Sequence, residues 1–132
     1  MKEDKMEIKK QITSKEAPAA IGPYSQAIKT GNMLFISGQL PMDAATGQLI
    51  EGSIADKTKK ALENVGAILK EAGMDFENLV KVTIFVTDMG NFAEINEEYK
   101  KYFPGIPPAR AVVGVASLPR NAELEIEGVA AC

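Results

Sequence analysis

The 132-residue sequence contains no histidine and no tryptophan, and its only cysteine, Cys132, is the last residue. Without histidine, the chain has no imidazole for a serine-type catalytic triad or for most transition-metal sites. A single terminal cysteine also excludes intrachain disulfide bonds and a cysteine nucleophile held inside a site. We therefore expect no metal site, and any catalysis must use other side chains.

The sequence also lacks a long apolar run and an excess of basic residues. Its most apolar stretch, residues 111–116, is far shorter than the roughly 20 residues that span a bilayer. The net charge is −3 and the isoelectric point is about 5.1, which disfavours nucleic acid as a partner but leaves a local basic patch open. Because the charged first ten residues have no apolar core typical of a signal peptide, we expect a cytoplasmic protein without membrane partners.

A single charged residue, Arg110, opens the otherwise apolar strand predicted within residues 107–117. The strand is rich in valine on both alternating sets of side chains, and such strands are normally covered on both faces. A guanidinium is always charged, and desolvating it without an anion costs several kcal/mol or more. Arg110 therefore needs a partner, which is either a protein carboxylate or the carboxylate or phosphate of a ligand.

The remaining pattern predicts one domain of residues 1–132, with residues 1–7 as a frayed extension. Thr30, Gly31 and Asn32 are suited to a tight hairpin turn, and a second turn is expected at residues 119–121. The expected strands are residues 8–12, 24–29, 33–39 and 79–87, the Arg110 strand, and residues 123–131.

Two amphipathic helices complete the predicted arrangement. The first covers residues 54–72, with Ser53 as its cap and Gly73 as its end. The second begins at Asn91, which forms a capping-box-like pair with Glu94. Its expected buried stripe is Phe92, Ile95, Tyr99, Tyr102 and Phe103.

Several polar residues near these strands have an ordinary and a functional interpretation. Ser37 and Gly38 end a strand where missing bulk would admit a ligand, but the Ser37 hydroxyl could simply bond a nearby carbonyl. Asn96 borders the second helix stripe and could be a polar edge residue. Glu125 shares one face of the last strand with Glu123 and Glu127, and three glutamates on one face are the pattern of a solvated face.

Strand direction predicts that Arg110 and Glu125 are far apart within one chain. A connection of about four residues joins their strands, so the strands run in opposite directions, paired directly or separated by one strand. Both residues lie near the start of their strands, at opposite ends of the sheet, on the order of 15 to 20 Å apart. A site that needs both side chains must therefore be assembled between chains.

Three separate segments together resemble the reactive intermediate deaminase (Rid, YjgF) family. They are residues 17–27, residues 37–39, and the stretch from Pro-Ala-Arg at 108–110 through Leu-Pro at 118–119 to Glu-Ile-Glu at 125–127. The resemblance extends from about residue 12 to the C-terminus, and the segments agree in order and spacing. It is strongest for the RidA type, the enamine/imine deaminases, which older usage also calls translation inhibitors or ribonucleases.

The resemblance implies an α+β, chorismate-mutase-like fold, with two helices on one face of a mixed sheet. It also implies a homotrimer with a cleft at each subunit interface. Arg110 would anchor the substrate carboxylate and Glu125 would orient water as acid or base. The implied cleft residues are Tyr24, Ser37, Gly38 and Asn96, and the apolar neighbours expected to hold an alkyl group are Ile21, Phe92 and Val112. One departure is Val112, because many relatives have cysteine two residues after the arginine.

The activity implied by the resemblance is hydrolysis of short 2-imino acids, such as 2-iminobutanoate and 2-iminopropanoate, to 2-keto acids and ammonia. The carboxylate suits a bidentate guanidinium. Because imines also hydrolyse spontaneously, a positioned water and a fixed substrate would suffice without a metal or cofactor. Two other classes stay open, namely an RNA-directed translation inhibitor or endoribonuclease, and a non-enzymatic 2-keto-acid-binding protein.

Overall fold

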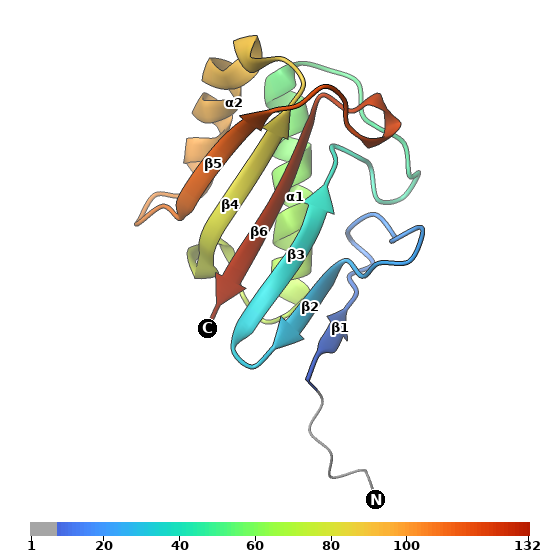
Figure 1. Ribbon diagram of the computed structural model, residues 1–132, viewed down its shortest axis with the longest axis vertical. Coiled ribbons are helices and arrows are strands. Elements are labelled where there is room, and N and C mark those ends of the chain that lie inside the picture. Colours follow the sequence, from blue (N-terminus) through green and yellow to red (C-terminus); the bar gives the residue numbers. More distant parts are fainter. Residues whose placement is uncertain (1–7) are drawn as a thin grey trace, which may run out of the picture.

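The computed structural model describes residues 8–132, in which a mixed six-stranded sheet carries two α-helices on one face (Figure 1). The extension expected at residues 1–7 lies outside the described part. Strand order is β1-β2-β3-β6-β4-β5, and every neighbouring pair is antiparallel except β4 and β5, which are parallel. The predicted α+β class with a mixed sheet is therefore confirmed.

The bounds of the strands and of the first helix lie within three residues of those expected, whereas the second helix ends at Tyr99 and its expected stripe continues into a 3₁₀ turn, Lys100–Tyr102. The strands are β1 Lys10–Ile12, β2 Ala27–Thr30, β3 Met33–Gln39, β4 Leu79–Val86, β5 Ala109–Gly114 and β6 Leu124–Ala131. The helices are α1 Ile54–Glu71 and α2 Phe92–Tyr99. In the β2–β3 hairpin Thr30 pairs with Met33, so Gly31 and Asn32 form the connection. Gly31 has φ 59°, the left-handed conformation that glycine adopts without steric cost.

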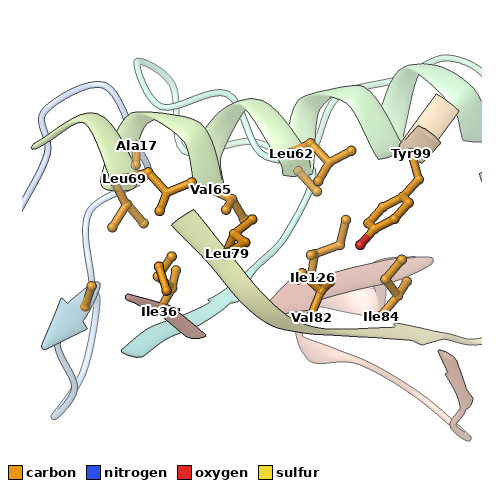
Figure 2. Close-up of a cluster of buried hydrophobic side chains, with 14 of the residues drawn as sticks. Ala17, Ile36, Leu62, Val65, Leu69, Leu79, Val82, Ile84, Tyr99 and Ile126 are labelled. Atoms are coloured by element: carbon orange, nitrogen blue, oxygen red, sulfur yellow. The ribbon is translucent and has the colours of Figure 1, made fainter. Parts of the chain in front are cut away.

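Helix α1 packs its apolar stripe on the sheet and forms the core with it. Ser53 accepts a hydrogen bond from the backbone N–H of Asp56, whose side chain accepts one from the N–H of Ser53 in turn. This capping box confirms the predicted helix start. Figure 2 shows side chains of the helix, among them Leu62 and Val65, over the strand side chains that they cover, among them Leu79, Val82 and Ile126.

The expected capping role of Asn91 in α2 is wrong. A short 3₁₀ turn, Met89–Asn91, leads directly into α2, so Asn91 has φ −86° and ψ 0° and makes no side-chain cap. An N-cap needs extended backbone, which Asn91 does not have here. Glu94 instead accepts a hydrogen bond from the backbone N–H of Ala55 at 3.2 Å and so connects α2 to the start of α1.

The expectation that the Arg110 strand is covered on both faces is also wrong for the chain by itself. Strand β5 lies at the sheet edge beside β4, because the parallel crossover through α2 places it there. Both helices lie on one face (Figure 1), and no described element covers the other. On that open face Val113 is 39% exposed and Phe35 of β3 is 46% exposed.

The capping box gives a direct test of how α1 is held. We expect Ser53→Ala to lower the free energy of unfolding by about 1 kcal/mol, because the backbone N–H of Asp56 loses its acceptor. Urea unfolding followed by circular dichroism measures the change. The matched variant Ser53→Asp keeps an acceptor at the same position and should unfold near the wild-type midpoint. Equal midpoints for all three proteins would contradict the assignment.

Candidate functional site

Arg110 lies on the helix-covered face of β5, where its guanidinium is only partly buried. Its Nη1 group donates a hydrogen bond to Oδ1 of Asn96 on α2, at 2.8 Å. Among residues 8–132 no carboxylate lies within ion-pair distance of Arg110. Of the two partners that the sequence left open, the described chain therefore supplies no carboxylate, and the remaining N–H groups can receive an external anion.

Helix α2 contacts Arg110 through side chains at positions i, i+4 and i+7, which share one helix face. The guanidinium carbon lies 5.7 Å from the ring centroid of Phe92 and 4.8 Å from that of Tyr99, with Asn96 between them. Val112, two residues along β5, packs against the core on the same face. The structure thus brings four of the predicted site residues, Arg110, Asn96, Phe92 and Val112, to the same face of the sheet.

Glu125 lies near the start of β6 on the opposite, open face of the sheet. Its carboxyl group occupies the space above Gly38 of β3, where an added Cβ would meet Oε2 at 2.5 Å. Partial burial raises the pKa of the Glu125 carboxyl above its usual value, and the nearby Glu127 carboxylate raises it further. The space left by the absent side chain of Gly38, which the sequence suggested would receive a ligand, is therefore filled by Glu125 of the same chain. The sequence pattern by itself did not reveal this contact.

The two neighbouring glutamates behave differently from Glu125. Glu123 precedes β6 and forms an ion pair with Lys57 of α1 at 3.0 Å, and Glu127 is exposed, as the ordinary interpretation expects. Glu125 differs from them because Gly38 lets it lie close to the sheet, where less water reaches the carboxyl group.

A pocket of about 610 Å³ lies beside Glu125 and gathers five of the predicted site residues: Ile21, Tyr24, Ser37, Gly38 and Glu125. The lining residues are Pro18, Ala19, Ile21, Tyr24, Gln26, Ser37, Gly38, Gln39, Leu40, Met42, Pro119, Arg120, Glu125 and Glu127. Arg110, Asn96, Phe92 and Val112 are not part of this lining. The predicted site therefore divides into an arginine half-site and a glutamate half-site.

The loop before β2 forms one wall of the pocket and is held by Gln26. This side chain is 2% exposed, accepts from the backbone N–H of Ser14 and donates to the carbonyl groups of Ser14, Ala17 and Pro18. The Ser37 hydroxyl donates to the Ser25 carbonyl at 2.6 Å, so its ordinary interpretation is correct, although Ser37 also lines the pocket. The backbone of this loop is therefore fixed, while the side chains of Tyr24 and Ile21 remain exposed to solvent. Ile21 is 79% exposed.

The two half-sites cannot meet within one chain. Arg110 pairs with Val82 of β4 and Glu125 with Phe85 of the same strand, three residues further along. Two strand spacings and three residue spacings separate them by on the order of 15 Å. The predicted antiparallel directions are confirmed, and of the two arrangements that the sequence left open the structure has the one with an intervening strand, β4. The sequence did not predict that the two side chains also point to opposite faces of the sheet.

Two residues at these half-sites were missed by the sequence reading. Arg120 lines the pocket from the turn Pro119–Asn121, where it has φ 62° and donates to the Gly47 carbonyl at 3.2 Å. Tyr99 was assigned only to the buried helix stripe. For Tyr99 the available signal was its spacing from Phe92 and Asn96 along one helix face. Nothing in the sequence placed Arg120 beside Glu125.

The described residues offer no group of three or more His, Cys, Asp or Glu side chains arranged to hold a metal ion. In the same part of the chain, no helix is both long enough and apolar enough to cross a membrane.

Comparison with known proteins gives one consistent family. The family model described as endoribonuclease L-PSP matches residues 14–132. A 2-iminobutanoate/2-iminopropanoate deaminase of Mus musculus is 50% identical over 123 residues, which cover 93% of this chain and 91% of that protein.

Solved structures agree with this match. YyfA of Yersinia pestis, described as a member of the conserved Rid protein family, is 45% identical with a TM-score of 0.91, over 94% of this chain and 99% of that one. TdcF of E. coli, solved with bound serine, is 43% identical with a TM-score of 0.89, over 93% and 98%. The chain therefore belongs to the reactive intermediate deaminase (Rid, YjgF) family, the family of the endoribonuclease L-PSP model.

Proposed function

We propose that the protein hydrolyses short 2-imino acids, such as 2-iminobutanoate and 2-iminopropanoate, to 2-keto acids and ammonia. The observation that carries the proposal is an arginine that has an amide and aromatic rings around it but no carboxylate among the described residues. Relatives about 50% identical over most of the chain, named 2-iminobutanoate/2-iminopropanoate deaminase, support the same substrate class.

Arg110 binds the substrate carboxylate in this proposal. Nη1 is already oriented by Asn96, and the other N–H groups form the planar edge that matches two carboxylate oxygens. Asn96 uses its oxygen for Arg110, so its NH₂ group is available to the same carboxylate. Phe92 and Val112 lie beside the guanidinium on the same face and would contact a short alkyl side chain.

Glu125 acts on the attacking water. Its raised pKa lets the carboxylate take a proton from water as the water oxygen bonds to the imine carbon. The substrate reacts as the iminium, so the C=N electron pair goes to nitrogen and a neutral carbinolamine forms. The Glu125 carboxylic acid then protonates that nitrogen and the C–N bond breaks to release ammonia. As the C=O bond forms, the hydroxyl proton passes through the Glu125 carboxylate to the ammonia. Water supplies the oxygen of the 2-keto acid, and no oxidant, metal or cofactor is needed.

The active unit is a homotrimer in which one subunit's arginine half-site faces the next subunit's glutamate half-site. Three features support this assembly: the separation of Arg110 from Glu125, their position on opposite sheet faces, and the open sheet face with exposed Phe35 and Val113. A cytoplasmic location stays a prediction of the sequence.

The RNA-directed alternative is favoured by the description of the family model, endoribonuclease L-PSP. The net charge of −3 and the absence of histidine disfavour it, because RNA binding draws on clustered basic residues. The keto-acid-binding alternative uses the same half-sites without turnover, so measured hydrolysis separates it from the deaminase.

One prediction of the proposed function concerns Arg110, the residue that binds the substrate carboxylate. Arg110→Ala should lower kcat/KM for imine hydrolysis by about 100-fold or more, because two charge-assisted hydrogen bonds to the substrate are lost. The assay couples a threonine dehydratase to this protein and follows imine loss against buffer alone. Lys100→Ala, which removes an exposed cation of the helix end, is the matched control. Retained activity in Arg110→Ala would remove the assignment, and RNA cleavage by purified protein that survives the change would favour the alternative.

A second prediction concerns pH. Since Glu125 must be deprotonated to take a proton, kcat/KM should fall as pH falls through the raised pKa of Glu125, at higher pH than an ordinary carboxyl would give. Glu125→Gln should abolish this acid limb and lower the plateau by about 100-fold. The profile is measured by stopped flow, with buffer hydrolysis subtracted at every pH. An unchanged acid limb in Glu125→Gln would show that another group titrates.

A third prediction tests assembly. Arg110→Ala and Glu125→Gln proteins, each nearly inactive, should regain about a quarter of wild-type activity after mixing in denaturant and refolding together, because random subunit exchange restores that share of sites. Sedimentation should give three copies of the 14.2-kDa chain. Inactive mixtures of correctly assembled trimers would place both residues in one subunit's site.

A further inference from the structure

The arginine half-site rests on an aromatic side chain that the proposed chemistry does not use. Tyr99 lies under Arg110, with 4.8 Å from the guanidinium carbon to the ring centroid, closer than Phe92 at 5.7 Å. The electron-rich face of an aromatic ring attracts a cation at this distance. Because Arg110 lies on an edge strand and has no carboxylate partner in the described chain, neutral contacts with α2 are what hold its position.

Tyr99 is itself supported by further rings. The ring of Phe103 lies 4.7 Å from that of Tyr99, and Phe76 lies 5.9 Å from Phe103 in an edge-to-face arrangement. Phe76 in turn packs on α1 at Gly66, where an added Cβ would meet the Phe76 ring at 2.9 Å. The row of rings from α1 to Arg110 is therefore close-packed, and Tyr99 cannot move away from the guanidinium without displacing it.

The hydroxyl of Tyr99 has no part in this support. Tyr99 is 5% exposed, and its Oη atom has no hydrogen-bond partner among the described residues. Figure 2 shows the hydroxyl directed into the core between the helix and the sheet, where the other labelled side chains are all apolar. Burial raises the pKa of Tyr99 to about 12, so the side chain stays neutral at physiological pH. The contact with Arg110 is therefore made by the ring face.

We propose that Tyr99 is the positioning residue for Arg110, and that its ring face, supported by Phe103 and Phe76, holds the guanidinium in the plane that receives the substrate carboxylate. This inference rests on the proposed function, because it assumes that Arg110 binds the substrate. A carboxylate needs both N–H groups of one guanidinium edge at once, so a guanidinium free to rotate would bind it less tightly.

The test compares three variants of the assembled protein. Tyr99→Leu removes the ring, Tyr99→Phe keeps the ring and removes the hydroxyl, and Tyr102→Leu is the matched control. Tyr102 lies one turn along, packs on Phe76 at 5.1 Å and makes no cation–π contact with Arg110. We expect Tyr99→Leu to raise KM for 2-iminobutanoate by about 10-fold with a smaller effect on kcat. Tyr99→Phe should retain near wild-type kinetics, as should Tyr102→Leu.

A spectroscopic measurement separates positioning from a general loss of packing. The chain has two arginines, Arg110 and Arg120, so the Nε–Hε resonances are assigned with one variant. The heteronuclear NOE of the Arg110 Nε–Hε group should be high in wild type, Tyr99→Phe and Tyr102→Leu, because the guanidinium is held in place, and it should fall in Tyr99→Leu. All proteins are first confirmed as folded oligomers by sedimentation and near-ultraviolet circular dichroism, and a misfolded Tyr99→Leu is replaced by Tyr99→Met.

The outcomes distinguish this inference from the proposed function. Wild-type KM in Tyr99→Leu, an unchanged heteronuclear NOE of Arg110 in that variant, or equal losses in Tyr99→Leu and Tyr102→Leu would each overturn the positioning role. If Arg110→Ala is inactive at the same time, the proposed function stands and only Tyr99 is misassigned. If Arg110→Ala is fully active, the proposed function fails first, whatever Tyr99 does.

Discussion

The site depends on one unbalanced charge. Arg110 is permanently cationic and partly buried, yet among residues 8–132 it meets an amide oxygen and two aromatic faces rather than a carboxylate. Neutral contacts orient a guanidinium without neutralising it, so its affinity for an incoming anion is preserved. A glutamate at the position of Asn96 would neutralise the charge and compete with the carboxylate that we propose as the ligand of Arg110.

The proposed reaction places the opposite requirement on Glu125, which has to be a carboxylate that accepts a proton more readily than an ordinary carboxylate. Gly38 makes room for the carboxyl group against the sheet, and the resulting loss of water raises its pKa. The loop held by Gln26 completes the surrounding pocket. Neither half-site does the proposed chemistry without the other, which is why the proposed function requires subunits to associate through the open face of the sheet.

Much of this arrangement was predictable from local pattern. Period-two and period-3.6 apolar spacing located the strands and both helices, and Ser53 and Gly31 marked a helix start and a hairpin because their chemistry suits those positions. The same reasoning wrongly predicted Asn91 as a helix cap, since the preceding 3₁₀ turn gives Asn91 a helical backbone conformation. The burial expected for β5 failed because covering one strand on both faces needs a second layer that the described chain does not supply.

By itself the sequence determined most of the secondary structure, the antiparallel directions of the Arg110 and Glu125 strands and their separation, because these follow from side-chain periodicity and connection length. Only the tertiary structure decided that the two side chains point to opposite sheet faces, that Glu125 lies over Gly38, and that Tyr99 lies under Arg110. Those contacts join residues far apart in the chain, or depend on how a helix packs on a strand, and no local pattern specifies either.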